Sequence, residues 1–264
     1  MSSILFAGVD IGSTTSKCVI LNENKEQLVF HRDYTLADRN ESGERVLNAS
    51  LQKIGASRND LCGIVSTGYG RKAFLCADKA ITEIIAHGIG TAELYPDVKT
   101  IIDIGGQDSK VIEVDHGMVV KFEMNDKCAA GTGRFFEVLT NRLMGVEMDE
   151  LSDMIAAADA PSQISSMCTI FAESEIISHL SEGQKKENII AGVGWAIARR
   201  IVGMGRSGRI PFNSQIVFSG GVANNRSIAG IFEQLLGKPV TPSVNPQSTA
   251  ALGAAITAVN EYKK

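Results

Sequence analysis

The chain has 264 residues, of which 44% are hydrophobic and 21% are charged. This length and composition are typical of a globular protein with a sizeable core and room for two lobes. The formal net charge is −4 and no run of basic residues occurs, which argues against a nucleic-acid partner, because phosphate recognition needs a basic face.

The sequence predicts a cytoplasmic protein without a membrane segment. The first strand begins at once, with no sign of the basic and apolar regions of a signal peptide. The longest small apolar stretch, residues 249–259, is too short and too rich in alanine to span a bilayer. The five cysteines are therefore expected to be reduced thiols or metal ligands rather than disulfides.

The first part of the chain alternates apolar runs with turn residues. The pattern predicts a meander of three strands, then a helix, a strand and a second helix. Pro96 and Asp97 break the chain after this part. The predicted strands lie at 4–9, 17–22, 26–34 and 61–68, and the predicted helices at 43–55 and 80–91.

The second part repeats that order and then adds helices. The small residues of its last helix permit close approach to another backbone, which we expect to belong to the first lobe. The predicted elements are strands at 99–104, 109–114 and 118–123, a helix at 132–144, a helical hairpin region at 149–205 with an irregular segment at 162–167, a strand at 216–221, a helix from about 226 and a last helix from Pro246 to Tyr262.

One string occurs twice in the chain. Val9–Lys17 is repeated in outline by Ile102–Lys110, at an offset of 93 residues. Each copy lies between two apolar runs, so each predicts a β-hairpin with a tight glycine turn and a carboxylate at its bend. The matching pairs are Asp10/Asp103, Ile11/Ile104, Gly12/Gly105, Ser16/Ser109 and Lys17/Lys110.

The repeat predicts an α/β protein of two duplicated lobes around a nucleotide cleft. We expect an N-terminal lobe at 1–96, a C-terminal lobe at 97–245 and a helix at 246–264 that returns to the first lobe. A ligand between the lobes would meet a carboxylate and a loop of small residues from each side.

Three glycine turns are candidates for the nucleotide site. Residues 12–15 and 105–107 offer the backbone N–H groups of a phosphate cradle, and residues 220–224 leave the backbone open for a base or ribose. A single glycine turn is usually only a turn, but three of them with an acid in each hairpin favour nucleotide binding. The predicted nucleotide-binding residues are Gly12, Ser13, Thr14, Thr15, Lys17, Gly105, Gly106, Gln107, Gly131, Gly133, Gly220, Gly221, Ala223 and Asn224.

The two acids suit a magnesium ion. Asp10 and Asp103 would hold hydrated Mg²⁺ and orient the attacking water, because Mg²⁺ binds through one or two carboxylates, waters and phosphates. Lys17 would neutralise phosphate charge and Gln107 would position water, so Asp10, Asp103 and Gln107 are the predicted catalytic residues. The alternatives are a surface ion pair for Lys17 and a turn-stabilising amide for Gln107. No G-x-x-x-x-G-K-[ST] string occurs, so this is not a P-loop site.

Longer strings resemble known families. DIGSTTSK (10–17), DIGGQDSK (103–110) and SGGVANN (219–225) resemble the phosphate and adenosine motifs of the sugar kinase/Hsp70/actin superfamily. Four further strings resemble the 2-hydroxyacyl-CoA dehydratase activators, of the BadF/BadG/BcrA/BcrD type. That family also contains ATPase subunits of benzoyl-CoA reductase and activators of double-cubane-cluster proteins. The strings are VSTGYGR (65–71), IIDIGGQDSKV (101–111), MNDKCAAGTGRFFEV (124–138) and CTIFAESEIISHLS (168–181).

The resemblance covers essentially the whole chain. It implies ribonuclease-H-like lobes that bind ATP or ADP. It also implies an electron donor with one 4Fe–4S cluster shared by a homodimer. Cys128 and Cys168 match the ligand positions of the family, and each precedes a predicted helix, whose N-terminus suits an anionic cluster. Two thiols per chain do not complete a four-thiolate site, and a two-fold axis would supply the other two.

The remaining cysteines need another explanation. A lone cysteine is usually a small buried hydrophobe, and that is our expectation for Cys18, Cys62 and Cys76. Residues 131–133 would serve as nucleotide wall and pivot between the cleft and Cys128. Glu137 would meet the ribose or simply be a solvated helix position.

The resemblance also implies partners. We expect ATP to drive electron transfer to a cluster-containing dehydratase or reductase, with reduced ferredoxin or flavodoxin as donor, in an anaerobic setting. Two alternatives stay open. A small-molecule kinase of the same superfamily would need a general-base carboxylate, for which Asp103 is the one candidate. An ATP-dependent docking regulator would have no redox role. Both leave Cys128 and Cys168 without a task.

Overall fold

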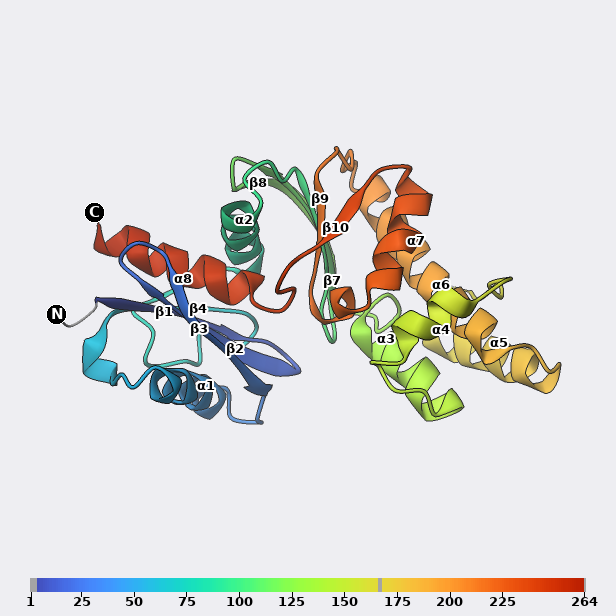
Figure 1. Cartoon of the computed structure of the whole chain (residues 1–264), viewed down its shortest axis with the longest axis horizontal. Helices are drawn as coiled ribbons and strands as arrows, with labels where there is room; N and C mark the ends of the chain where they lie inside the picture. Colours follow the sequence, from blue (N-terminus) through green and yellow to red (C-terminus); the bar gives the residue numbers. More distant parts are fainter. Residues whose placement is uncertain (1–3, 166–167, 264) are drawn as a thin grey trace. The chain divides into compact units, whose positions relative to one another are not determined.

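The computed structural model describes residues 4–165 and 168–263. These residues form an α/β arrangement of two compact units (Figure 1). Unit 1 comprises residues 1–98, 114–120 and 247–264, and unit 2 comprises residues 99–113 and 121–246. No helix in the described ranges is long and apolar enough to cross a membrane.

Unit 1 is built on a mixed sheet of five strands in the order β3-β2-β1-β4-β5. The first three strands form the predicted antiparallel meander, and β4 pairs in parallel with both β1 and β5. The two-residue strand β5 was not predicted, because it is too short to show any alternation. The strands are β1 (Leu5–Ile11), β2 (Thr15–Asn22), β3 (Gln27–Tyr34), β4 (Leu61–Thr67) and β5 (Lys79–Ala80).

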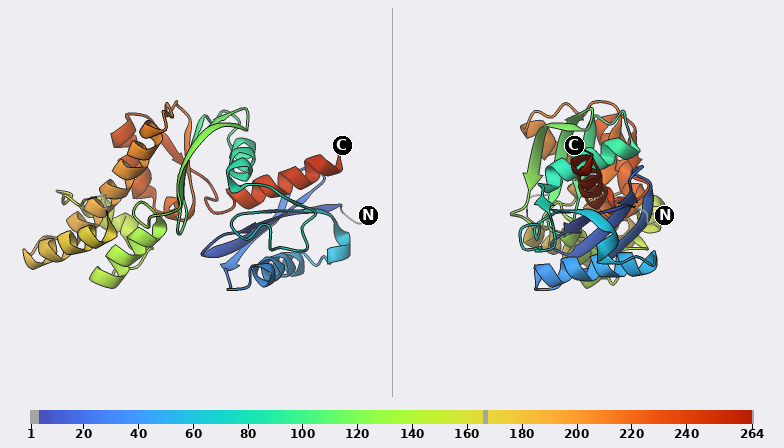
Figure 2. Two further views of the ribbon diagram at one scale, coloured as in Figure 1. Left: turned by 180° about the vertical axis from the view of Figure 1, so that it is seen from behind. Right: turned by 90° about the vertical axis from the view of Figure 1, so that its left-hand side faces the viewer.

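Helices cover both faces of this sheet (Figure 2). The odd-numbered residues of β1 pack with α1, and Phe6 packs on the other face with α8. Helix α1 begins four residues before its predicted start, because the Asp38 carboxylate accepts from the N–H groups of Asn40 and Glu41 and caps it. The helices are α1 (Arg39–Lys53), η1 (Arg58–Asp60), α2 (Glu83–Leu94) and α8 (Thr249–Tyr262).

The small residues of α8 allow unusually close packing within unit 1. A Cβ atom on Gly8 of β1 would lie 2.0 Å from the Ala251 carbonyl oxygen, and one on Gly253 would lie 1.9 Å from that of Ala86 in α2. Side chains at either glycine would therefore force α8 away from β1 or α2. This contact holds the C-terminal helix in the same unit as β1.

Unit 2 contains a second five-stranded sheet in the order β10-β9-β6-β7-β8. The short strand β10 was not predicted, since its three residues contain a proline. The strands are β6 (Thr100–Ile104), β7 (Ser109–Asp115), β8 (Met118–Asn125), β9 (Ile216–Ser219) and β10 (Val240–Pro242).

The helices of unit 2 differ in detail from the prediction. The single helix expected at 132–144 is a short α-helix followed by a π-helical turn, where the Thr140 hydroxyl bonds back to the Phe136 carbonyl. The region predicted as a helical hairpin at 149–205 contains three helices, separated near Pro161 and Gly183. Residues 166–167 of the predicted irregular segment lie outside the described residues. The elements are α3 (Gly133–Glu137), η2 (Val138–Arg142), α4 (Leu151–Ala157), α5 (Thr169–Ser181), α6 (Lys186–Ser207), η3 (Gly221–Asn224) and α7 (Arg226–Leu236).

The two sheets have the same connectivity. Strands β1, β2, β3, β4 and β5 of unit 1 correspond to β6, β7, β8, β9 and β10 of unit 2 in order. The register agrees as well, because Asp10 pairs with Lys17 and Asp103 pairs with Lys110. The duplicated fold predicted from the repeated string is therefore confirmed, and it extends over all five strands of each sheet.

Candidate active site

The hairpin of unit 1 joins an acid to a lysine. Asp10 lies near the end of β1 and is buried, and its Oδ2 is 3.0 Å from Nζ of Lys17 on β2. The Lys17–Asp10 pair is therefore not a surface ion pair. It is mostly buried, and its ammonium lies beside Gly12, 3.4 Å from where a Cβ on that glycine would be.

The loop of this hairpin is rich in hydroxyl groups and is fixed from outside. Gly12 donates its N–H to the Thr15 carbonyl at 3.1 Å, and the Thr35 hydroxyl donates to the Gly12 carbonyl at 3.0 Å. Ser13 is half-buried and Thr14 is exposed at the tip. Predicted residues 12–15 thus form one tight turn, whose small side chains leave its backbone accessible.

Two residues at the end of β4 were not among the predicted site residues. Thr67 pairs with Asp10 across β1 and β4, and its side chain is fully buried. Gly68 follows with a φ of +83°, and a Cβ there would lie 2.4 Å from Oδ1 of Asp10. The VSTGYGR string could have indicated these two residues, because it places a hydroxyl residue and a glycine at the end of a predicted strand.

The hairpin of unit 2 has a more complete polar network. Nζ of the fully buried Lys110 lies 3.2 Å from Oδ2 of Asp103 and 2.8 Å from Oδ2 of Asp108. Ser219, which ends β9, donates its hydroxyl to Oδ1 of Asp103 at 2.9 Å. Lys110, Asp108 and Ser219 were missing from the predicted site.

The glycine loop of this hairpin is bonded to the start of α3. Gly133 and Arg134 donate their backbone N–H groups to the carbonyls of Gly105 and Gly106, each at 2.8 Å. A Cβ on Gly133 would lie 2.9 Å from the Gly105 oxygen, so glycine is needed for this approach. Gln107 is exposed at the hairpin tip.

The third predicted glycine turn lies after β9. Gly220 has a φ of +86°, and a Cβ there would lie 2.3 Å from the Ile104 carbonyl oxygen of β6. Residues 221–224 form the short helix η3, in which Ala223 is buried and Asn224 is exposed. Asn225 then caps α7 by accepting from the Ser227 N–H at 3.1 Å.

The two candidate cluster cysteines lie in different local settings of unit 2. Cys128 is half-buried in a turn that the Asn125 side-chain amide holds, donating to the carbonyls of Cys128 at 2.9 Å and Ala130 at 3.0 Å. Cys168 is half-buried and is the N-cap residue of α5, as predicted. Its side chain makes no capping bond, so the thiol is available beside the partial positive charge of that helix end.

The other cysteines agree with expectation only in part. All five are free thiols. Cys18 is fully buried, and this burial raises its pKa to about 12, as suits an inert core thiol. Cys62 is exposed, so the expectation of a buried residue is wrong there: it is the second residue of β4, whose buried residues lie at the other end of the strand. Cys76 is half-buried and accepts from the Arg58 guanidinium at 3.1 Å.

Glu137 forms an ion pair on the surface of α3. Its carboxylate accepts both of its bonds from the Arg134 guanidinium, at 2.9 and 3.0 Å, one turn earlier on an exposed helix surface. Such exposed pairs contribute little to stability.

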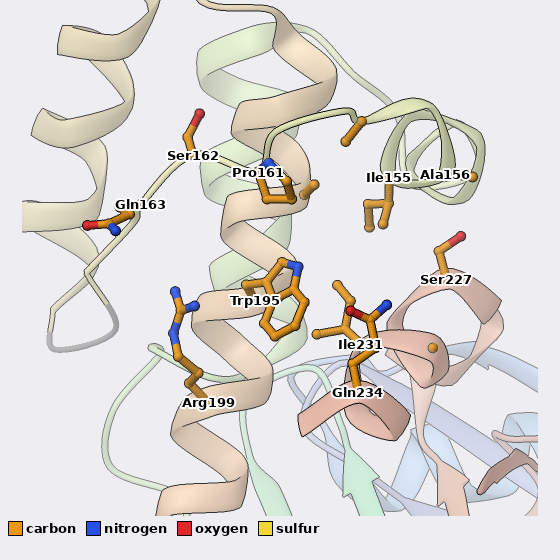
Figure 3. A pocket seen from close by; sticks show the side chains of 13 residues that line it. Ile155, Ala156, Pro161, Ser162, Gln163, Trp195, Arg199, Ser227, Ile231 and Gln234 are labelled. Atoms are coloured by element: carbon orange, nitrogen blue, oxygen red, sulfur yellow. The ribbon is translucent and has the colours of Figure 1, made fainter. Parts of the chain in front are cut away.

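Unit 2 also contains a cavity of about 700 Å³ away from these groups. Figure 3 shows that it is bounded by α4, α6 and α7, with the Trp195 indole and Ile231 facing the hollow. The Arg199 guanidinium lies 6.0 Å from the centre of the Trp195 ring. The described residues that line it include none of the predicted site residues, so it is not part of the candidate active site.

Comparison with known proteins agrees with this geometry. The profile of the BadF/BadG/BcrA/BcrD ATPase family matches residues 7–258. The (R)-2-hydroxyglutaryl-CoA dehydratase activating ATPase of Acidaminococcus fermentans is 41% identical, over 99% of this chain and 98% of its own length. The structure of the activator of the 2-hydroxyisocaproyl-CoA dehydratase from Clostridium difficile, with bound ADPNP, has a TM-score of 0.92 and 40% identity, covering 98% of this chain and 96% of that one.

A remoter likeness concerns the fold alone. ROK hexokinase from Thermus thermophilus has a TM-score of 0.54 at 16% identity, over 98% of this chain and 99% of that one. The predicted actin/Hsp70/sugar kinase fold is therefore confirmed.

Proposed function

Because the chain belongs to the BadF/BadG/BcrA/BcrD ATPase family, we propose that it is an ATP-hydrolysing activator that passes a low-potential electron from a 4Fe–4S cluster to a partner enzyme. The partner is a 2-hydroxyacyl-CoA dehydratase or a related reductase. The observation that carries the proposal is the joint presence of two phosphate-type hairpins and two available thiols, one of them at a helix N-terminus.

Three turns are the proposed nucleotide-binding segments: the glycine turn of each hairpin and the turn after β9. The hairpin of unit 1 offers small residues and an ammonium beside Gly12, which suits phosphate oxygens. Residues 220–224 receive the adenosine. A relative with the same fold was solved with ADPNP, which supports a nucleotide of this class.

Magnesium fits the acids of the hairpins. Oδ1 of Asp10 is buried and has no hydrogen-bond partner among the described residues, so it is an oxygen ready for a hard cation or for a water on that cation. Asp103 contributes through the remaining lone pairs of its carboxylate, and Gln107 is exposed at the loop tip, where its amide reaches a water. These three residues are the proposed catalytic groups.

Cys128 and Cys168 would hold the cluster. Their thiols are free and half-buried, and the positive end of α5 stabilises negative charge at Cys168. When bound, a 4Fe–4S cluster supplies a one-electron donor. Because these two proposed ligands fill only half of a four-thiolate site, four ligands require two chains, and a homodimer is proposed.

The surface of α5 supports that dimer. Beginning two residues after Cys168, the helix exposes Ile170, Phe171 and Ile177, which are 70%, 63% and 50% accessible. Large apolar side chains gathered beside a metal ligand are expected to be covered by another protein surface. We propose that the second copy covers this surface.

The backbone of unit 2 links the nucleotide to the cysteines. Bonds from Gly133 and Arg134 tie the phosphate loop to α3, and the Thr132 N–H and hydroxyl bond the Ala129 carbonyl, at 3.0 and 2.7 Å, within the Cys128 turn. A shift of the phosphate loop on nucleotide binding would therefore move this turn. Residues 131–133 act as the predicted pivot.

We place this reaction in the cytoplasm of an anaerobic cell, with reduced ferredoxin or flavodoxin as electron donor. Free thiols at the surface and a cluster between two chains require a reducing compartment without oxygen.

Anaerobic purification and reconstitution test the proposal. Iron, sulfide, visible absorption and mass are measured, and the reduced protein is mixed with ATP and the dehydratase of Acidaminococcus fermentans. We expect a brown dimer with about four iron atoms per two chains and ATP-dependent activation of the dehydratase. A monomer with a full complement of iron, or a dimer that stays free of iron, would contradict it. An iron-free protein that phosphorylates a sugar would indicate a kinase, and one that only binds ATP would indicate a regulator.

A further inference from the structure

The two sheets place the same three side chains in a row across neighbouring strands. In unit 2 the row is Lys110, Asp103 and Ser219, on β7, β6 and β9. In unit 1 the corresponding row is Lys17, Asp10 and Thr67, on β2, β1 and β4. In both rows the hydroxyl residue is followed by a glycine with positive φ, +83° at position 68 and +86° at position 220.

The rows differ in how the acid meets the hydroxyl. In unit 2 the Ser219 hydroxyl donates to Oδ1 of Asp103 at 2.9 Å. In unit 1 both Oδ1 of Asp10 and Oγ1 of Thr67 are buried without a hydrogen-bond partner among the described residues. Asp10 is 3% exposed and Thr67 is 0% exposed, so open solvent does not satisfy either atom.

Two such atoms on adjacent strands form half of a site for a small polar ligand. Neighbouring strands lie about 4.8 Å apart, and residues paired in register point to the same face. Ser219 and Asp103 are paired in this way and bond directly, whereas the Thr67 hydroxyl and Oδ1 of Asp10 do not bond to each other, so a water between them would satisfy both atoms. Buried polar atoms without partners are costly, so their retention side by side needs an occupant.

Gly68 packs directly against the same carboxylate oxygen. A Cβ at position 68 would lie 2.4 Å from Oδ1 of Asp10 and 2.6 Å from the Ile11 carbonyl. Any side chain there would push the end of β4 away from Asp10. The glycine and the threonine of the VSTGYGR string thus both lie beside the Asp10 carboxylate.

We propose that Thr67 is a positioning residue for the ATPase reaction: its hydroxyl and Oδ1 of Asp10 together hold the attacking water. This inference rests on the proposed ATP hydrolysis and adds a residue to it. The water oxygen bonds to the γ-phosphorus as the bond from that phosphorus to the bridging oxygen breaks. ADP keeps the bridging oxygen, and both protons of the water leave on the phosphate product.

The test compares variants of the full-length, anaerobically prepared protein. Thr67→Val keeps the shape and removes the hydroxyl, and Thr67→Ser keeps the hydroxyl. Thr100→Val is the matched control, because Thr100 is an equally buried strand threonine with an unpartnered hydroxyl, at the opposite end of β6 from Asp103. Steady-state kcat and KM for ATP, the Kd of ADPNP and the melting temperature without nucleotide are measured.

We expect Thr67→Val to lower kcat by roughly 10- to 100-fold with the Kd of ADPNP unchanged, because a bond to the attacking water is lost. Thr67→Ser should stay within about threefold of wild type, and Thr100→Val should keep wild-type kcat. The Thr67→Val protein should melt no lower than wild type, since removal of an unsatisfied hydroxyl does not destabilise the fold. If Thr67→Val fails to fold, Thr67→Ala replaces it in the same comparison.

A double variant separates this inference from the proposed function. If one water is shared, Asp10→Asn combined with Thr67→Val should lose no more activity than Asp10→Asn alone. Wild-type kcat in Thr67→Val, while Asp10→Asn is inactive, would overturn the role of Thr67 and leave the ATPase proposal intact. A wild-type protein that neither binds ADPNP nor hydrolyses ATP would overturn both.

Discussion

The Asp–Lys pairs of the two hairpins have the same strand register but differ in how many oxygens of the acid accept a hydrogen bond. In unit 2, Asp103 bonds a lysine through one oxygen and a serine through the other. In unit 1, Asp10 bonds a lysine through Oδ2, and its Oδ1 has no partner among the described residues. Both oxygens of Asp103 thus accept a bond from a neighbouring strand, whereas one oxygen of Asp10 accepts none from the described residues.

The two hairpins also differ at one position of the turn. Where the first copy has Thr15, the second has Asp108, whose Oδ2 lies 2.8 Å from Nζ of Lys110. A hydroxyl at this position suits a phosphate oxygen, and a carboxylate suits a hydrated cation.

The sharpest contrast between the units concerns their cysteines. Cys168→Ser in unit 2 should abolish iron binding in the reconstituted protein, because a four-thiolate site that loses a ligand from both copies keeps only two. Cys62→Ser in unit 1, at an exposed thiol, should keep the full iron content. Iron and sulfide are measured together with the Kd of ADPNP, which we expect to stay within about twofold in both variants. Loss of nucleotide binding along with iron would contradict the division of labour between the glycine turns and the thiols.

The two hairpins should lose different amounts of stability when the lysine of each Asp–Lys pair is replaced. Lys110→Met removes the ammonium that lies between two buried carboxylates, Asp103 and Asp108, and should lower the free energy of unfolding by about 3–5 kcal/mol. Lys17→Met removes the ammonium from one buried carboxylate, Asp10, at a lysine that is 15% exposed, and should cost less, about 1–3 kcal/mol. Urea denaturation followed by circular dichroism measures both. Equal decreases in the free energy of unfolding would contradict this expected difference between the two Asp–Lys pairs.

Removal of the hydroxyl from each row should change stability in opposite directions. Ser219→Ala leaves Oδ1 of Asp103 without its donor in a buried site and should cost about 1–3 kcal/mol. Thr67→Val removes a hydroxyl that has no partner among the described residues, so the free energy of unfolding should stay level or rise slightly. Melting temperatures of the nucleotide-free proteins provide the measurement. A destabilised Thr67→Val would mean that its hydroxyl already has a partner in the resting protein.

The repeated string predicted the duplicated fold because its spacing reflects strand pairing. Asp10, Lys17 and their counterparts are close in sequence, so the register of each hairpin follows from a short turn. Thr67 and Ser219 are different, because their strands return to the central strand only after helices of unequal length. The sequence separation between Thr67 and Ser219 differs from the 93 residues that relate the two hairpins. A repeat search at one fixed offset therefore does not pair them.

The helical region between β8 and β9 in the sequence was predicted less well for another reason. Apolar residues recur in all three of its helices, so their spacing alone does not mark where one helix ends and the next begins. The breaks lie near Pro161 and Gly183. Proline and glycine are typical of helix ends, but the prediction of a two-helix hairpin did not use them. The position of Cys168 at the start of α5 was nevertheless predicted, since the apolar spacing begins immediately after it.

The smallest expected effect sharpens the contrast between inert and available thiols. Burial raises the pKa of Cys18 from its ordinary value of 9.0 to about 12, although a hydrogen bond from Ser50 opposes the shift. The folded protein therefore holds the thiol proton more tightly than the unfolded chain, and the resulting stability is complete below pH 9 and is lost as the pH rises toward 12. Between these values wild type should lose about 1.4 kcal/mol per pH unit more than Cys18→Ala, which has no thiol to ionise. Urea unfolding of cluster-free protein at pH 8, 9.5 and 10.5 gives the difference. A constant difference across this range would mean that water reaches Cys18 in the folded state.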